Sequence, residues 1–413
     1  MKHILAGVAL GLLCGACSSV ADVSATADAD IEVVMPERVT DLILQTLPDI
    51  AAALEAGEVS SEELVTAYLI RIETIDRSGP TLQSVLAVIP NALEDAVESD
   101  ARRAMGKSWG PLDGVPILLK DNIESLDPVA TTAGALALKD NITGRDSPLV
   151  AGLREQGAII LGKTNLSQWA NFRSNESMSG WSALGGQVRN PHMLDRNPCG
   201  SSSGSGAAAA ASLAAGTVGT ETNGSVICPA NVNGIVGFKP TVGLVAQDYI
   251  VPISSSQDTA GPMTKSVTGA AMMMNAMATG EAKTDYVAAL DADSLSGARV
   301  GVMRFSQGSN ADILGRFNEA LAVLETQGAT LVEIDDFSPD AENFWGDALS
   351  VLQYEFKHTL NEYLASTPEA VTTRSLAELI AFNEANAEIE LALFDQSLFV
   401  ASEENGPVAD EAS

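Results

Sequence analysis

The sequence predicts an α/β fold in which a mixed, mostly parallel central sheet is covered by helices on both faces. The main observation is that short apolar segments typical of strands alternate with longer segments of helical periodicity. A second is that 46% of the 413 residues are hydrophobic, which is enough for a large core. Strands separated by helices favour parallel neighbours, because a crossover helix packs back onto the sheet.

The predicted elements follow one another in order. Helical structure is expected from about residue 42, since Ser60 to Glu63 offers a capping box and Leu64, Tyr68 and Ile72 recur on one face. The predicted strands are 85–89, 114–120, 158–161, 234–238, 299–303 and 330–334. The predicted helices are 92–105, 147–156, 313–327 and most of 341–400, where Leu376, Leu379 and Ile380 share an apolar face.

The first 21 residues have the pattern of an export leader, with a cationic start, an apolar middle and a small-residue end. Cys17, followed by two serines, predicts lipoprotein processing. Cys14 stands where a leucine is usual, so cleavage after Ala21 is the alternative. Either route predicts an exported protein, periplasmic or attached to a membrane through a lipidated Cys17 only. Residues 22–41 are small and acidic and predict a tether before a folded domain over 42–413.

The net charge of −31 disfavours nucleic acid as a partner, because a strongly acidic chain repels phosphates. The pattern of letters at 157–164 also satisfies a phosphate-binding loop. In such a loop the strand precedes the first glycine. Here Ala158 to Leu161 occupies the loop and predicts the strand itself, so nucleotide binding is rejected. The oligomeric state is left open.

Two small-residue turns between Pro198 and Ser225 carry the chemistry. Ser201, Ser202 and Ser203 lie among glycines, and a β-like segment leads to the turn Thr222-Asn223-Gly224-Ser225. Hydroxyls on glycine-bordered turns suit a nucleophile and its proton relay, since small neighbours admit a substrate carbonyl. A flexible Gly/Ser linker is the alternative. The small apolar residues 207–215 that follow argue against it, because they must pack closely.

Few side chains in the sequence could act as the base that activates these serines. The chain has three histidines, His3, His192 and His358, so a Ser-His-Asp arrangement has two candidates outside the leader. Lys120 is the other option. It ends GVPILLK, which predicts a buried strand, and burial lowers a lysine pKa from about 10.4. The carboxyl end of a strand is also where α/β enzymes keep their sites.

Taken together, Lys120 in GVPILLKD, the loop CGSSSGSG and the TNGS turn resemble the amidase signature family of Ser-Ser-Lys hydrolases. Ser225 follows Ser201 by 24 residues, as in the family. The resemblance continues through LGKTNLSQWANFRS, CPANVNGIVGFKPTVGLV and SQDTAGPMTKSV and covers about residues 50–400. Within the family, the chain is most similar to bacterial peptide amidases, which remove the C-terminal amide of peptides and release ammonia.

The resemblance implies a role for each site residue. Ser225 would be the nucleophile, Ser201 would relay the proton after a cis Gly200–Ser201 bond, and Lys120 would be the base. The oxyanion hole would be formed by the backbone N–H groups of Thr222, Asn223, Gly224 and Ser225. No metal and no organic cofactor are implied, and the substrate would be a small amide or a peptide amide. The serine loop reads CGSSSGS where the family usually has GGSSGGS, and the second turn reads ETNGS where the family usually has DTGGS. Neither change removes the oxyanion donors, because these are main-chain N–H groups.

Four further residues and two cysteines also concern these turns. The resemblance implies that Trp169, Asn171, Phe172 and Trp181 line the acyl side of the cleft, with plain core aromatics as the alternative. Cys199 and Cys228 flank the two turns. A disulfide between them is possible in an oxidising compartment, although buried free thiols are favoured.

Three further interpretations stay open. Family members continue well past the length of this chain, so further strands and one wall of the cleft are expected to be missing. A broad acylamide or aryl-amide hydrolase, or a non-catalytic exported binding lipoprotein with the same fold, remain alternatives. The tRNA-dependent amidotransferase component shares the motifs but works with a cytosolic partner, which the leader contradicts.

Overall fold

The computed structural model describes residues 35–339 and 342–406, and contacts along the chain divide it between Met35 and Pro36. The predicted leader and most of the predicted tether lie outside the described residues. Helix α1 (Glu37–Leu42) begins before the predicted boundary at 42. The tether prediction is therefore wrong at its end, because Val39 and Ile43, four residues apart, are both buried on one face of the chain. Among the described residues, no helix combines the length and apolar character needed to cross a bilayer.

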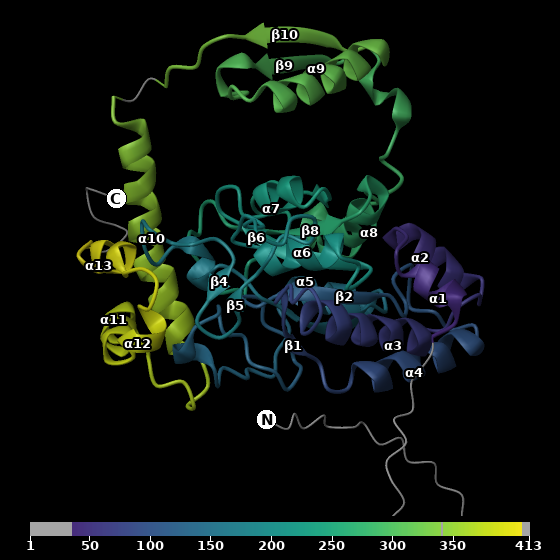
Figure 1. Cartoon of the computed structure of the whole chain (residues 1–413), viewed down its shortest axis with the longest axis horizontal. Coiled ribbons are helices and arrows are strands. Elements are labelled where there is room, and N and C mark those ends of the chain that lie inside the picture. Colours follow the sequence, from purple (N-terminus) through teal and green to yellow (C-terminus); the bar gives the residue numbers. More distant parts are fainter. Residues whose placement is uncertain (1–34, 340–341, 407–413) are drawn as a thin grey trace, which may run out of the picture. The chain divides into compact units, whose positions relative to one another are not determined.

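A six-stranded sheet in the order β1-β3-β2-β6-β8-β7 forms the centre of this unit (Figure 1). Its strands are β1 (Val85–Val88), β2 (Pro116–Lys120), β3 (Ile159–Thr164), β6 (Gly216–Glu221), β7 (Val236–Gly237) and β8 (Thr259–Thr264). Strands β3, β2 and β6 pair in parallel, whereas β1, β8 and β7 join in antiparallel fashion. The predicted mixed sheet is confirmed, but the expectation that it is mostly parallel is corrected: two of its five strand pairings are parallel, and both lie at its centre.

Helices cover this sheet. Every residue of β2, β3, β6 and β8 is buried, which is the pattern of strands covered on both faces. The helices of this part are α2 (Leu47–Glu55), α3 (Ser61–Arg71), α4 (Ala92–Ala104), α5 (Pro148–Glu155), α6 (Ser203–Ala210), α7 (Ile227–Val232) and α8 (Val267–Met277). Helix α6 packs against β2, β6 and β8, while α3 packs on β2 and α4 on β3. The capping box predicted at Ser60 and Glu63 is present at the start of α3.

Strand β8 was not expected from the sequence, because it contains a glycine and a proline, which usually interrupt strands. Gly261 is required by close backbone approach: a Cβ there would lie 2.0 Å from the carbonyl oxygen of Phe238. Pro262 still accepts a hydrogen bond, from the Phe238 N–H to its carbonyl oxygen, at 3.1 Å. Tertiary contact thus overrides local preference at this strand.

Strand β3 shows whether residues 157–164 form a phosphate-binding loop or a strand. Ile159 to Thr164 are buried and paired with β1 and β2, so the segment forms a strand instead of a loop that wraps phosphates. The expectation drawn from the sequence is confirmed.

Two small sheets lie outside the central one. Strands β9 (Arg299–Met303) and β10 (Thr330–Ile334) pair in parallel, and helix α9 (Ala311–Thr326) connects them, as predicted. Strands β4 (Trp181–Ser182) and β5 (Gly186–Gln187) form a short antiparallel pair.

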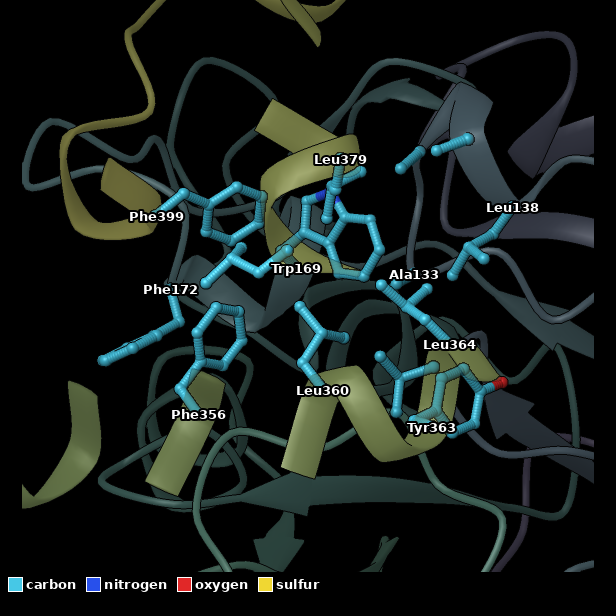
Figure 2. Close-up of a cluster of buried hydrophobic side chains, with 14 of the residues drawn as sticks. Ala133, Leu138, Trp169, Phe172, Phe356, Leu360, Tyr363, Leu364, Leu379 and Phe399 are labelled. Carbon is cyan, nitrogen blue, oxygen red and sulfur yellow. The ribbon is translucent and has the colours of Figure 1, made fainter. Parts of the chain in front are cut away.

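The C-terminal helices supply a second hydrophobic cluster. They are α10 (Phe344–Ala365), α11 (Leu376–Ala385), α12 (Ala387–Glu390) and α13 (Ser397–Glu403), which confirms the helical prediction for this segment. Figure 2 shows Trp169 and Phe172 among Phe356 and Phe399 of these helices. The ring centroids of Trp169 and Phe399 are 5.7 Å apart. The cluster also includes Val251 and Ile253, which line a pocket of the central unit. Helices α10 and α13 therefore support part of the wall of that pocket.

Candidate active site

Lys120 occupies the last position of β2 and is completely buried. Its Nζ lies 2.8 Å from Ser201 Oγ and 2.8 Å from Thr220 Oγ1. The carbonyl oxygen of Thr220 is a further acceptor at 3.3 Å. Because β2 and β6 pair in parallel, Lys120 and Thr220 both lie at the carboxyl ends of their strands, on the same side of the sheet. The order of the strands therefore fixes the position of the amine.

The surroundings of Lys120 favour a neutral amine. Burial lowers its pKa from 10.5 to about 7, and the negative charges of Asp258 and Glu221 act in the opposite direction. A lysine with a pKa near 7 is partly unprotonated at neutral pH, so it can accept a proton from a neighbouring hydroxyl. The sequence predicted this effect from the apolar run before Lys120.

The serine loop is packed inside the protein. Ser201, Ser202 and Ser203 have no exposed surface, which excludes the flexible-linker alternative. The peptide bond between Gly200 and Ser201 is cis, as the family resemblance implied. The Ser202 N–H donates to the carbonyl oxygen of Ser225 at 3.1 Å, so the loop is tied directly to the second predicted turn.

Ser225 lies in the turn between β6 and α7, with 8% of its surface exposed. The side chain of Glu221 binds the backbone of this turn. Its carboxylate accepts hydrogen bonds from the N–H groups of Gly224 (2.8 Å), Val226 (2.7 Å) and Ile227 (2.9 Å). Gly224 has φ of +86°, a conformation that glycine adopts readily. Because the Gly224 N–H is engaged by Glu221, the oxyanion prediction rests on the N–H groups of Thr222, Asn223 and Ser225.

Two charged side chains hold Thr222. Its hydroxyl donates to Asp258 Oδ1 at 2.5 Å, and its carbonyl oxygen accepts a hydrogen bond from Lys239 Nζ at 2.6 Å. The other oxygen of Asp258 accepts from the N–H groups of Ile253 and Ser254 at 2.8 and 2.9 Å. Burial raises the pKa of Asp258, and these hydrogen bonds oppose the rise. Asp258 therefore joins the turn before Ser225 to the loop 253–254.

Ser201 and Ser225 open into one narrow pocket. Its lining combines polar groups with four apolar side chains: Asn122, Ala170, Ser201, Thr220, Glu221, Thr222, Ser225, Gln247, Ile250, Val251, Ile253 and Asp258. A more voluminous cavity of about 870 Å³ lies between α2, α3 and α4. Two of its charged residues, Arg103 and Asp100, are paired with each other, and none of the predicted site residues lines it. The predicted serines therefore line the narrow pocket and not the larger cavity.

None of the four residues predicted to line the cleft is among the residues that line the pocket. Trp169 and Phe172 are buried in the hydrophobic cluster of Figure 2, so the prediction is corrected for these two rings. The Asn171 side chain donates to Ser179 Oγ at 3.1 Å, and Trp181 packs edge-on against Phe394. Ala170, which sequence reasoning did not single out, lines the pocket. The aromatic residues of this segment fill the core and present the small side chain to the site.

Cys199 and Cys228 form a disulfide, whereas the sequence favoured free thiols. Their Cα atoms are 6.0 Å apart, a spacing that a disulfide bridges without moving the backbone. Spacing along the chain, 29 residues, carries no information on this geometry. The bond joins the start of the serine loop to α7, so it braces the two turns against each other.

The histidine alternative is not supported by the geometry. His192 is exposed and its Nε2 contacts the Asn233 carbonyl oxygen, while the exposed His358 pairs with Glu362 on the same helix. Neither partner is one of the predicted serines. Within residues 35–339 and 342–406, no group of three or more His, Cys, Asp or Glu side chains is arranged to hold a metal ion.

Besides Asn122 and Gln247, which line the pocket, sequence reasoning missed four polar residues that contact the predicted site. Thr220 contacts Lys120, Glu221 and Asp258 hold the turn before Ser225, and Lys239 binds the Thr222 carbonyl. All four lie in segments that carry the family resemblance or directly beside them, and this was the only signal that could have found them. Their functions depend on contacts between distant segments, which spacing does not reveal.

Comparison with known proteins relates this chain to one family. A model of the amidase family matches residues 63–394. The solved structure of a peptide amidase from Stenotrophomonas maltophilia superposes with a TM-score of 0.85 at 45% identity, covering 89% of this chain and 77% of that one. A protein of Arthroderma benhamiae named as an amidase is 42% identical over 69% of this chain and 50% of its own length. Another protein named as an amidase, from Arabidopsis thaliana, is 38% identical over 87% of this chain and 72% of its own length.

These matches cover most of this chain but a smaller share of the relatives, and the chain spans half the length of the Arthroderma benhamiae protein. The match to the family model includes Lys120, Ser201 and Ser225, together with the residues that hold them. By its sequence and by its fold, this chain belongs to the amidase family.

Proposed function

We propose that this protein is a serine amide hydrolase that releases ammonia from the C-terminal amide of peptides. One observation carries the proposal: a buried lysine with a lowered pKa lies 2.8 Å from Ser201 Oγ, in the pocket that Ser225 also lines. In this proposal the lysine and Ser201 form a proton relay to the nucleophile Ser225, and the lysine takes the part of the base that histidine has in other serine hydrolases.

In the proposed reaction, Ser225 Oγ attacks the carbonyl carbon of the amide. Its proton passes to Ser201, and the proton of Ser201 passes to neutral Lys120. The negative charge on the substrate oxygen is stabilised by backbone N–H groups of the Thr222 to Ser225 turn. The relay then returns a proton to the leaving nitrogen, so ammonia departs and an ester to Ser225 remains. Water, activated by the same relay, hydrolyses this ester and releases the acid.

The peptide amide as substrate is supported by likeness to the Stenotrophomonas maltophilia peptide amidase, which extends over 89% of this chain. The pocket is also consistent with a small leaving group. Polar groups of both turns line it together with Asn122, Gln247 and Asp258, and Ala170, Ile250, Val251 and Ile253 supply an apolar part of its wall. Such a wall suits the uncharged backbone and side chain of a peptide residue next to the amide.

The substrate proposal is tested by ammonia release from acetylated dipeptide amides and simple aliphatic amides, and by aniline release from anilides. We expect release from the dipeptide amides at a kcat/KM at least about tenfold above that for the aliphatic amides, because remote contacts lower the transition-state energy. Activity confined to simple amides or anilides would keep the mechanism and overturn the substrate. No activity on any set, with folded protein, would favour a binding protein with the same fold.

We also propose that the protein is exported. The leader pattern of residues 1–21 supports this, and so does the disulfide between Cys199 and Cys228, since disulfides persist mainly in oxidising compartments. Fractionation of Gram-negative cells that produce the full chain tests it. Recovery in the membrane fraction that shifts to the soluble periplasm in Cys17→Ser is the result expected for lipid attachment. Periplasmic recovery of both proteins would indicate simple cleavage, and cytoplasmic recovery of both would overturn export.

A further inference from the structure

Lys239 contacts the turn before Ser225 from outside the pocket. Its side chain is 28% exposed, and its Nζ donates to the carbonyl oxygen of Thr222 at 2.6 Å. The same Nζ lies 3.9 Å from Glu221 Oε1, which is a long distance for an ion pair. The short contact with the carbonyl is therefore the main interaction of this ammonium with the turn.

The carbonyl of Thr222 and the N–H of Asn223 belong to one peptide unit. A charged donor on the oxygen of a peptide unit draws electron density toward that oxygen, so the N–H on the other side becomes a stronger donor. The Asn223 N–H is one of the three predicted oxyanion donors that Glu221 leaves available. The charge of Lys239 is thus transmitted through one peptide unit to the place where the substrate oxygen becomes negative.

We propose that Lys239 is a positioning residue that orients and polarises the Thr222–Asn223 peptide unit, so that the Asn223 N–H stabilises the oxyanion of the transition state. This inference rests on the proposed amide hydrolysis.

The contacts around Thr222 show that its peptide unit is held in a fixed orientation. Asp258 binds the side chain of Thr222, and Lys239 binds its carbonyl oxygen. Glu221 fixes the following residues through Gly224 and Val226. A donor that is already oriented costs no reorganisation when charge develops, which is the condition under which such groups are most effective.

A purely structural role does not require a lysine here. Because 28% of the Lys239 side chain is exposed, water can reach this region and can satisfy the Thr222 carbonyl in its absence. Replacing Lys239 is therefore expected to leave the fold intact while reducing the stabilisation of the transition state.

The chain offers a matched control in Lys265. Its Nζ donates to the Leu44 carbonyl oxygen at 2.7 Å and also to Ser212, so it makes the same kind of backbone contact. Neither Leu44 nor Ser212 lines the pocket of Ser225. Lys265→Met therefore removes an equivalent contact without touching the predicted oxyanion turn.

The experiment compares kcat, KM and the melting temperature of the unchanged protein, Lys239→Met, Lys239→Gln, Lys239→Arg and Lys265→Met on one peptide amide. For Lys239→Met we expect kcat to fall by about 10- to 100-fold with little change in KM, since removing a whole donor costs about 100-fold or more. Lys239→Gln keeps a neutral donor and should lie between Met and the unchanged protein. Lys239→Arg keeps the charge and should recover most of kcat, and Lys265→Met should retain kcat.

A second readout separates transition-state stabilisation from structure. A peptide aldehyde that forms a tetrahedral adduct with serine should lose affinity in Lys239→Met by the same factor as kcat/KM. The carboxylic acid product should bind with unchanged affinity. An active enzyme whose Lys239→Met variant keeps its kcat, or loses aldehyde and product affinity equally, would overturn the inference alone. If the protein without substitutions is folded yet inactive on every amide, the proposed function is overturned and this inference with it.

Discussion

Replacing Ser225 with alanine is expected to lower kcat for amide hydrolysis by on the order of 10⁴-fold or more, because the variant has no atom that can form the acyl intermediate. Ser225 is 8% exposed and its hydroxyl is small, so its removal should leave the fold unchanged. Ammonia release with a peptide amide is the measurement. Ser205→Ala is the matched control, since Ser205 is buried and its hydroxyl bonds to the Val218 carbonyl oxygen.

The Ser205→Ala variant should keep kcat within a small factor of the unchanged protein, although it loses a buried hydrogen bond. A Ser225→Ala variant that retains activity while Ser205→Ala behaves as expected would show that another group attacks the amide. The assignment of the whole relay would then be wrong.

Replacing Lys120 with methionine is expected to have the second largest effect, a loss of kcat on the order of 10³-fold, because no other base among the described residues contacts Ser201. Methionine has a similar volume and fills the buried site at the end of β2. Activity and melting temperature should be measured together. A loss of activity matched by a large drop in melting temperature would not support the assignment, whereas a folded, inactive variant would.

The pH dependence of activity follows from the same residue. Lys120 acts as a base only when it is neutral, and burial sets its pKa at about 7. Below that value kcat/KM should therefore fall about tenfold per pH unit, and above it kcat/KM should level off. A profile that falls as the pH rises from 6 to 8 would contradict a lysine base.

The same pKa shift predicts an effect on stability with a defined sign. Between pH 7 and pH 10.5, Lys120 is neutral in the folded protein and charged in the unfolded chain. The unfolded state then binds more protons, so the contribution of this residue to folding stability rises with pH across that range. Its destabilising contribution is fully present below pH 7. Lys120→Met removes it, so the free energy of unfolding near pH 7 should not decrease greatly.

The residues predicted best from the sequence are those whose function depends on local pattern. Lys120 was located because an apolar run predicted a buried strand that ends at a charge, and the structure places it at the end of β2. Ser201 and Ser225 were located because glycine-bordered turns and a known spacing mark them. The structure brings Lys120 and Ser201 into contact and places Ser225 in the same pocket. Their catalytic roles stay predictions.

The residues that were missed act across long sequence separations. Asp258 contacts Thr222 from 36 residues away, and Lys239 reaches the same residue through the arrangement of β7 and β8. The disulfide also depends on how the serine loop and α7 approach each other. Trp169 and Phe172 were assigned to the cleft because they lie in a segment that carries the family resemblance, but their rings pack against helices from 344–403. Such contacts exist only once the chain has folded.

The most direct test of the central claim is covalent labelling with a peptide fluorophosphonate, followed by mass spectrometry of the intact protein and its peptides. We expect one adduct per chain, located on Ser225, absent in Ser225→Ala and formed more slowly in Lys120→Met. The labelling rate should rise with pH through about 7, in parallel with the neutral form of Lys120. An adduct on another residue, or equal labelling rates in the unchanged protein and Lys120→Met, would contradict the Ser225–Ser201–Lys120 relay.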